Sequence, residues 1–169
     1  MLTIDCLRES PIGPIWVAQS DAGLVAIYIG AHEARLREII ARLTKADIRR
    51  DPGRVQPALA QLHEYLHRQR QSFTLPIDNS ILTPFQQEVL SLVQQIPYGQ
   101  VRTYGDIARA LGKPGASRAV GRANATNPLP IVIPCHRVLG SDGKLHGYGG
   151  GAGLETKAWL LRLEGSRLI

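Results

Sequence analysis

The chain has 169 residues, of which 44% are apolar and 20% charged, so it can bury a real core and is not of a disordered type. Its net charge of +6 favours a polyanionic partner. No apolar run approaches the ~18 residues of a membrane helix, and the N-terminus lacks the basic-then-apolar order of a secretory signal. These features exclude a membrane protein and predict a soluble protein of the cytoplasm.

The two cysteines, Cys6 and Cys135, are too few for a disulfide framework. His63 and His67 stand four residues apart, but no cysteine lies near them. The pair is a weak metal signal and is read as two partly solvated helix residues. We therefore predict no metal and no cofactor.

Residues 1–78 are predicted to form a small α/β domain. Two β-rich runs, 12–17 and 24–29, flank the turn-forming residues Ser20 to Gly23 and indicate a hairpin. Apolar residues at Leu36, Ile39, Ile40 and Leu43 have the spacing of one buried helix face.

A second helix is predicted around residues 55–66, and a last short strand over 73–77. Residues 78–80 (Asp-Asn-Ser) read as a linker. No catalytic constellation occurs in this half, so its expected role is that of a scaffold.

Residues 79–169 form the second predicted domain, which opens with a strong helix start. Thr83 offers a capping hydroxyl, Pro84 suits the first helical position, and Gln86 completes a capping box. The helix is expected to end at Pro97-Tyr98-Gly99.

A helix-turn-helix is predicted next, from two short helical patterns over 103–112 and 117–125 separated by a KPGA turn. Residues 100–125 carry five basic residues against the single acid Asp106. Arg118 and Arg122 share one face of the second helix, and its small residues would allow close approach to a surface. The plainer alternative is a packed helix pair with a solvated basic face.

Cys135 lies in the segment IVIPCHRVLG, directly before His136 and Arg137. A buried cysteine is most often inert, but cationic neighbours would lower the pKa of this thiol and favour the nucleophilic thiolate. Adjacent side chains of an extended segment point to opposite sides, so His136 would need a water relay or a bend to act as its base. A thiol hydrolase is equally compatible with this pair alone.

The order RAVGRA, NP, PCHRV, GYGGG and KAWLLRLEG resembles the O6-alkylguanine-DNA alkyltransferase family over residues 83–165. The SPIGPIWVA segment is also similar, with weaker motifs. The resemblance implies a ribonuclease H-like α/β domain followed by a mainly α, winged-helix-like domain with a helix-turn-helix. It also implies irreversible, single-turnover transfer of an alkyl group from guanine O6 in double-stranded DNA to Cys135, with the target base flipped out of the duplex.

The resemblance also assigns roles to individual residues. It implies Cys135 as acceptor, His136 as base acting through a water, Glu164 as the residue that orients His136, and Tyr104 as donor to the guanine ring. It implies that Arg118 fills the gap left in the base stack and that Asn127 ties the recognition helix to the active-site segment. Sequence-independent contact in the minor groove is implied for the recognition helix and the residue that follows shortly after it. The residues concerned are Ser117, Arg118, Ala119, Gly121, Arg122 and Asn127.

The alkylguanine pocket is implied to include Val138, Tyr148 and Gly149. Backbone groups of Cys135 and Val138 would read the exocyclic amine. Some members carry a serine where this chain has Gly149, which leaves the preferred alkyl size open. Cys6 resembles a zinc ligand of some members, but its companion cysteine is absent from the sequence.

Three rival functions fit the sequence less well. A non-catalytic alkyltransferase-like protein would have tryptophan in place of Cys135. A methylation-responsive transcription factor would need a further DNA-binding module and a methyl-accepting cysteine cluster. A thiol hydrolase would turn over repeatedly. We expect a monomer, and cooperative binding along DNA stays open.

Overall fold

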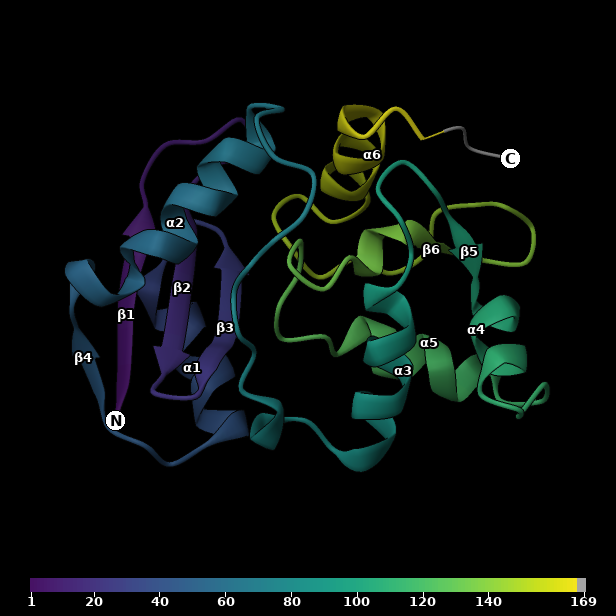
Figure 1. The fold of residues 1–169 in the computed structure, drawn as a ribbon, viewed down its shortest axis with the longest axis horizontal. Helices are drawn as coiled ribbons and strands as arrows, with labels where there is room; N and C mark the ends of the chain where they lie inside the picture. The colour runs from purple at the N-terminus through teal and green to yellow at the C-terminus, as the bar shows by residue number, and fades with distance from the viewer. Residues whose placement is uncertain (167–169) are drawn as a thin grey trace. The chain divides into compact units, whose positions relative to one another are not determined.

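The computed structural model describes residues 1–166 of the chain. These residues form two compact units, Met1–Ile81 and a second unit that begins at Leu82 (Figure 1). The first unit is α/β and the second mainly helical, which confirms the predicted fold class.

A four-stranded sheet forms the centre of the first unit, in the order β3-β2-β1-β4. Its strands are β1 (Leu2–Leu7), β2 (Ile15–Ser20), β3 (Gly23–Ile29) and β4 (Ile48–Arg50). The first three are antiparallel neighbours, and β4 pairs with β1 in parallel. The predicted hairpin is therefore confirmed as β2 and β3, although its first strand begins at Ile15 instead of residue 12.

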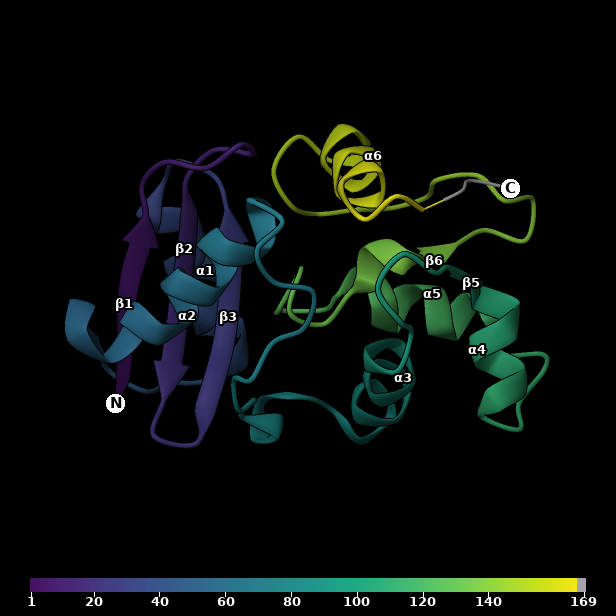
Figure 2. The same cartoon turned by 45° about the horizontal axis from the view of Figure 1, so that its top comes forward.

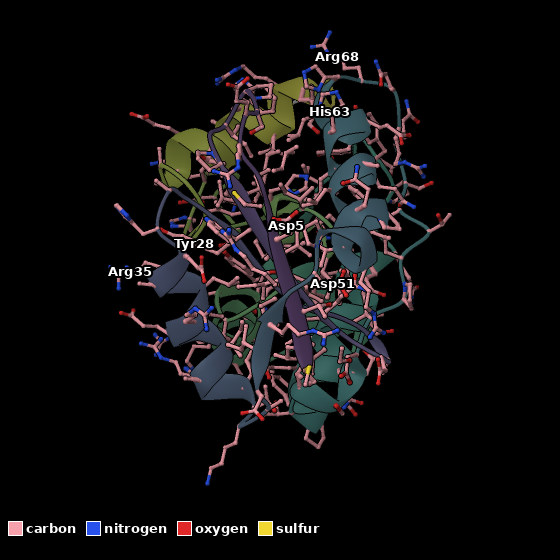
Figure 3. All side chains as sticks on the ribbon, turned by 90° about the vertical axis from the view of Figure 1, so that its left-hand side faces the viewer. Asp5, Tyr28, Arg35, Asp51, His63 and Arg68 are labelled. Atoms are coloured by element: carbon pink, nitrogen blue, oxygen red, sulfur yellow. The ribbon has the colours of Figure 1, made fainter. Side chains whose placement is uncertain are left out.

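Helices α1 (Glu33–Leu43) and α2 (Pro52–Leu66) cover opposite faces of this sheet (Figures 1 and 3). In Figure 3 they flank the strand that carries Asp5, and Arg35 projects from α1 away from the sheet. On the α1 side, Leu36 and Ile40 pack against strand residues such as Trp16. Each such buried aliphatic side chain contributes roughly 1.5–3 kcal/mol.

The segment predicted as a strand over 73–77 forms only an isolated bridge, between Ile77 and Leu24. A Cβ on Gly23 would collide with the carbonyl of Pro76, so only glycine lets the two backbones approach this closely. Two residues of the predicted linker, Asn79 and Ser80, belong to a short 3-10 turn, η1 (Asn79–Ile81). Just before it, the Asp78 carboxylate accepts hydrogen bonds from the hydroxyls of Ser20 and Ser80.

The second unit contains four helices and a two-stranded parallel sheet among the residues described. The helices are α3 (Pro84–Gln94), α4 (Tyr104–Ala110), α5 (Ser117–Ala125) and α6 (Leu154–Leu163). The strands β5 (Arg102–Thr103) and β6 (Val138–Leu139) are short, and the 3-10 turn η2 (Cys135–Arg137) directly precedes β6. Figure 2 shows α4 and α5 side by side, in the helix-turn-helix arrangement that the sequence predicts.

Two capping boxes define where α3 and α4 begin. The Thr83 hydroxyl accepts from the Gln86 backbone N–H, while the Gln86 side chain accepts from the Thr83 N–H. Thr103 and Asp106 repeat this exchange at α4, which fixes Tyr104 as the first residue of that helix. None of the helices within residues 1–166 is long and apolar enough to cross a membrane.

Candidate active site

Cys135 sits at the start of η2, at the end of a segment held by side-chain hydrogen bonds. Asn127 Nδ2 donates to the Ile133 carbonyl at 3.0 Å, and Asn127 Oδ1 accepts from the Leu129 N–H at 2.9 Å. Between these points Ile131 has a φ of 75°, which is strained for a β-branched residue. Strain of this kind persists only where the surroundings fix the backbone, as Asn127 does here.

His136 and Glu164 meet in the interior of the unit. His136 Nε2 lies 2.8 Å from Glu164 Oε1, and both side chains are fully buried. A carboxylate beside Nε2 favours the tautomer with its hydrogen on that nitrogen, so Nδ1 carries the lone pair. Burial lowers the pKa of His136 from 6.5, against the opposing effect of Glu164, so the imidazole is a neutral base at physiological pH.

Arg137 is the counter-ion of Glu164. Its Nε and Nη2 donate to the carboxylate at 2.9 and 2.7 Å, and its Nη1 donates to the Ile96 carbonyl at 2.7 Å. The guanidinium also lies over the Tyr98 ring, 5.7 Å from its centroid. Arg137 therefore neutralises Glu164, and its charge is not directed at the thiol.

The expectation that His136 and Arg137 lower the pKa of Cys135 is wrong. Burial raises the pKa of this thiol, which is only 6% exposed. Three smaller effects lower the pKa of the thiol: a hydrogen bond from the Asn127 side chain, the positive charge of Lys157, and hydrogen bonds from the backbone N–H groups of Cys135 and His136. The resting cysteine is therefore a protonated thiol that needs a base at the moment of reaction.

Lys157 is a buried charged residue beside this segment that the sequence analysis did not single out. Its Nζ donates to the carbonyls of Val138 and His146 at 2.8 and 2.7 Å, and the residue is fully buried. Burial lowers the pKa of Lys157 to about 8, although the negative charge of Cys135 acts to raise it. A signal was present, because Lys157 lies three and four residues before the buried Leu160 and Leu161 and so falls on the buried face of α6.

Tyr104 is half-buried at the start of α4, close enough to Cys135 for a thiolate charge there to affect the pKa of its phenol. Burial raises the pKa of this phenol, the negative charge of Cys135 raises it further, and a hydrogen bond from the Asn124 side chain lowers it. Asn124 is a second residue that the sequence analysis missed. It lies on the inner face of α5, where polar side chains are uncommon.

The predicted pocket residues lie around the same segment. The Val138 carbonyl accepts from Lys157, whereas the Cys135 carbonyl already accepts from both Asn124 Nδ2 and the Val138 N–H. Tyr148 is buried, and its hydroxyl has no hydrogen-bond partner among the residues described. A Cβ built on Gly149 would meet no atom within 4 Å, so open space lies beside this residue.

The predicted DNA-binding residues lie on or just after α5. Arg118 and Arg122 are exposed, while Ser117, Ala119, Gly121 and Asn127 are half-buried. A Cβ on Gly121 would also point into open space. Helix α5 thus presents two arginines with small residues between them.

The histidine pair of the first unit stacks without forming a larger cluster. The ring centroids of His63 and His67 lie 4.1 Å apart, and both residues are exposed. Within residues 1–166, no three His, Cys, Asp or Glu side chains gather as a metal site would require. Both cysteines of the chain are free thiols.

Comparison with known proteins gives matches along nearly the whole chain. Residues 6–79 match the family domain described as "6-O-methylguanine DNA methyltransferase, ribonuclease-like domain", and residues 84–166 match the DNA binding domain of the same family. A methylated-DNA--protein-cysteine methyltransferase of Methanosarcina acetivorans is 40% identical over 158 residues, which cover 94% of this chain and 96% of the relative.

Solved structures agree with these matches. The O6-methylguanine methyltransferase of Mycobacterium tuberculosis superposes with a TM-score of 0.80 at 38% identity, covering 97% of this chain and 93% of that one. The structure of Mycobacterium tuberculosis OGT in complex with DNA gives the same TM-score at 37% identity, over 96% of this chain and 92% of that one.

Proposed function

The chain belongs to the 6-O-methylguanine DNA methyltransferase family, and on that premise we propose that it repairs DNA by moving the alkyl group of O6-alkylguanine onto its own Cys135. One observation carries the proposal. A buried free thiol is followed by a neutral histidine that is hydrogen-bonded to a buried carboxylate, in the unit that also carries the arginine-bearing helix α5. This arrangement has the nucleophile, base and orienting group that covalent catalysis needs.

The reaction begins with removal of the thiol proton. His136 Nδ1 takes the proton of Cys135 through one water, while Glu164 holds the imidazole by its other nitrogen. The positive charge of Lys157 stabilises the thiolate as it forms, because charges interact more strongly in a buried site than in bulk water. Sγ then attacks the alkyl carbon, a C–S bond forms, and the bond between that carbon and guanine O6 breaks.

The departing guanine needs a proton because negative charge develops on its ring. Tyr104 is the donor in this proposal, since its phenol is coupled electrostatically to Cys135 and its raised pKa keeps it protonated. The proton held by His136 then passes through water to the Tyr104 oxygen, which restores both residues. The net result is that the thiol hydrogen is replaced by the alkyl group and guanine gains one hydrogen. The thioether is a poor leaving group, so each molecule reacts once.

Access to a base inside a duplex requires that the nucleotide be flipped out. Helix α5 is the element proposed to enter the minor groove, where its small residues permit close approach and Arg122 contacts the backbone. Arg118 would occupy the space left by the flipped base, as wedge side chains do. Asn127 would keep the end of α5 in register with Cys135 through its bond to the Ile133 carbonyl.

The pocket for the flipped base is proposed to lie beside Val138, Tyr148 and Gly149. The Val138 carbonyl has a lone pair left to accept from the exocyclic amine, whereas two donors already occupy the Cys135 carbonyl. The unpartnered hydroxyl of buried Tyr148 is suited to a polar ligand. The open space at Gly149 would admit alkyl groups larger than methyl.

In this proposal the two domains have separate roles. Residues 1–78 serve as a scaffold, and residues 79–169 bind DNA and accept the alkyl group. The protein acts as a monomer in the cytoplasm, where thiols stay reduced.

A label-transfer experiment tests the proposal with a control that the chain itself supplies. The protein is incubated with a duplex that carries one O6-methylguanine with a labelled methyl group. Wild type and Cys6→Ser should each take up one label per molecule, and Cys135→Ser should take up none. Label on Cys135→Ser, or uptake beyond one per molecule, would overturn the assignment. Lesion binding without uptake by the wild type would indicate a non-catalytic lesion-binding protein.

A further inference from the structure

The turn between α3 and β5 packs against the end of α6, where Glu164 lies. The Gln100 N–H donates to the Pro97 carbonyl at 3.0 Å, which closes a tight turn over residues 97–100. Gly99 is the third residue of this turn and has a φ of +80°. A turn that needs a positive φ at its third residue favours glycine at that position.

Gly99 approaches Glu164 at two points. Its backbone N–H donates to Glu164 Oε2 at 3.5 Å, a long hydrogen bond. A Cβ on Gly99 would lie 3.1 Å from the Glu164 carbonyl oxygen, which is closer than a side-chain carbon normally comes to a neighbour. Glycine is therefore required here for two reasons, the backbone angle and the neighbouring carbonyl.

Tyr98 contacts the same region of the unit. Its hydroxyl donates at 3.4 Å to the carbonyl of Leu163, the residue before Glu164. The Arg137 guanidinium lies over its ring, and Arg137 Nη1 donates to the carbonyl of Ile96, just before the turn. The turn thus contacts both Glu164 and the counter-ion of Glu164.

The position of the Glu164 carboxylate matters because one of its oxygens orients the base. Oε1 lies 2.8 Å from His136 Nε2, whereas Oε2 is the oxygen that Gly99 approaches. Glu164 is the C-cap residue of α6, and helix ends fray, so its fixed position depends on such neighbours. A shift of the carboxylate would change the alignment of His136, and proton transfer is sensitive to small misplacements.

We propose that Gly99 and Tyr98 are positioning residues for alkyl transfer, which hold the Glu164 carboxylate against His136. This inference rests on the function proposed above, in which His136 takes the proton of Cys135. In this role neither residue touches the substrate. Their effect on the rate passes through Glu164 and His136.

Gly99→Ala and Gly112→Ala form a matched pair of variants. Both glycines have a positive φ, of +80° and +74°, so alanine strains the backbone at either position. A Cβ on Gly112 meets no atom within 4 Å, whereas a Cβ on Gly99 presses on Glu164. With free O6-benzylguanine as substrate, Gly99→Ala should slow transfer about tenfold and Gly112→Ala less than about twofold. Equal rates in the two variants would overturn the inference.

The pH profile of the rate distinguishes this role from a loss of stability. Burial lowers the pKa of His136, Glu164 opposes this shift, and the charges of Arg137 and Lys157 add to it. A carboxylate displaced from His136 should therefore move the acid limb of the profile to lower pH in Gly99→Ala, and leave it in place in the control variant. An acid limb that stays in place in Gly99→Ala would contradict the proposal.

Gly99→Asn keeps the proposal testable if the alanine variant does not fold. Asparagine tolerates a positive φ better than alanine does, but it carries the same Cβ. The variant should therefore fold more readily and still transfer the benzyl group more slowly than the wild type. A wild-type rate in Gly99→Asn would exclude the contact with Glu164 as a constraint on catalysis.

Tyr98→Leu and Tyr98→Phe test the second positioning residue. Leucine removes both the ring beneath Arg137 and the hydroxyl that bonds the Leu163 carbonyl, so transfer should slow about tenfold. Phenylalanine keeps the ring and should recover most of the rate. An unchanged rate in Tyr98→Leu would remove Tyr98 from this role.

The ring N–H of His136 gives a reading that does not depend on transfer. The hydrogen on Nε2, bonded to the Glu164 carboxylate, should resonate far downfield in the wild type and move upfield in Gly99→Ala as the bond weakens. A resonance at the wild-type position in Gly99→Ala would count against the proposal. If the wild type transfers no alkyl group, the proposed function fails, and this resonance still decides whether Gly99 positions Glu164.

Discussion

His136 Nε2 and Glu164 Oε1 lie 2.8 Å apart with no exposed surface on either side chain. Glu164 is the C-cap residue that directly follows α6, and His136 is the middle residue of η2, so 28 positions separate them in the chain. The carboxylate serves both His136 and the guanidinium of Arg137. The interior of this unit can therefore hold the neutral imidazole of His136, the ion pair of Glu164 and Arg137, and the protonated thiol of Cys135.

Glu164→Gln tests the orienting role of the carboxylate. Glutamine has the same shape but removes the charge that fixes the imidazole tautomer and neutralises Arg137. Transfer to Cys135 should slow by about 10²-fold or more, in the range of general base catalysis. The free energy of unfolding should fall by about 3–5 kcal/mol, because a buried charge loses its partner. Single-turnover rates and chemical denaturation measure the two effects, and an unchanged rate would remove Glu164 from the mechanism.

The pH dependence of transfer follows from the pKa of His136, which burial holds below 6.5. Protonation of this base stops the reaction, so the acid limb of the rate profile should have its midpoint below pH 6.5. The same shift affects stability. In the unfolded chain His136 takes up a proton near pH 6.5, whereas in the folded chain it does so only at lower pH. The free energy of unfolding therefore decreases as the pH falls from about 6.5 to the lower pKa of the folded state. A rate profile whose midpoint lies above pH 6.5 would contradict a buried neutral base.

Lys157→Met removes the buried cation while it preserves most of the side-chain volume. Loss of the charge should raise the pKa of Cys135 further and slow transfer about tenfold. The carbonyls of Val138 and His146 lose their shared donor, at a cost of roughly 1–3 kcal/mol in stability. Lys144→Met is the matched control, because Lys144 is exposed in the loop between β6 and α6 and should show neither effect. Equal behaviour of the two variants would exclude an electrostatic role for Lys157.

Gly149→Ser and Gly149→Ala separate bulk from hydrogen bonding in the pocket. Neither side chain meets an atom within 4 Å at its Cβ, so both variants should fold with an unchanged melting temperature. Both should lower the rate with O6-benzylguanine relative to O6-methylguanine, because the added atoms fill space that a larger alkyl group needs. A ratio that changes only in the serine variant would point to its hydroxyl instead of its bulk. An unchanged ratio in both variants would place Gly149 outside the pocket.

Arg118→Ala tests the assignment of base flipping to α5. Repair of a duplex should slow by about tenfold or more, while reaction with free O6-benzylguanine should stay within about twofold of the wild type. Arg122→Ala is the comparison variant, since loss of a backbone contact should weaken DNA binding and lower its salt dependence by about one charge. Equal losses on duplex and free base would remove Arg118 from the flipping role.

The local signals in the sequence were sufficient for most helices of the second unit. Thr83 and Gln86 predicted where α3 begins, and the structure contains that capping box. The short strands could not be found in this way. Strand β4 has three residues and is defined by its parallel pairing with β1, a contact that no local pattern contains. Residues 73–77 have the composition of a strand, but only Ile77 pairs, in an isolated bridge with Leu24.

The identity of the site residues could be predicted from the sequence, but their charge interactions and the direction of their pKa shifts could not. The motif placed Cys135, His136 and Glu164 in one centre, and the structure brings His136 and Glu164 into contact. Proximity in sequence suggested that Arg137 activates the thiol, but its guanidinium is bound to Glu164. Asn124 and Lys157 donate hydrogen bonds to backbone carbonyls, and the sequence does not reveal which carbonyls a buried polar side chain will reach.

The most direct test of the account is the mass of the intact protein after incubation with a duplex containing one O6-methylguanine, followed by digestion to locate the change. The account predicts a gain of one methylene per molecule, located on Cys135, with no further gain when fresh duplex is added. An unchanged mass while the lesion stays bound would contradict the transfer reaction, as would a methyl group located on Cys6.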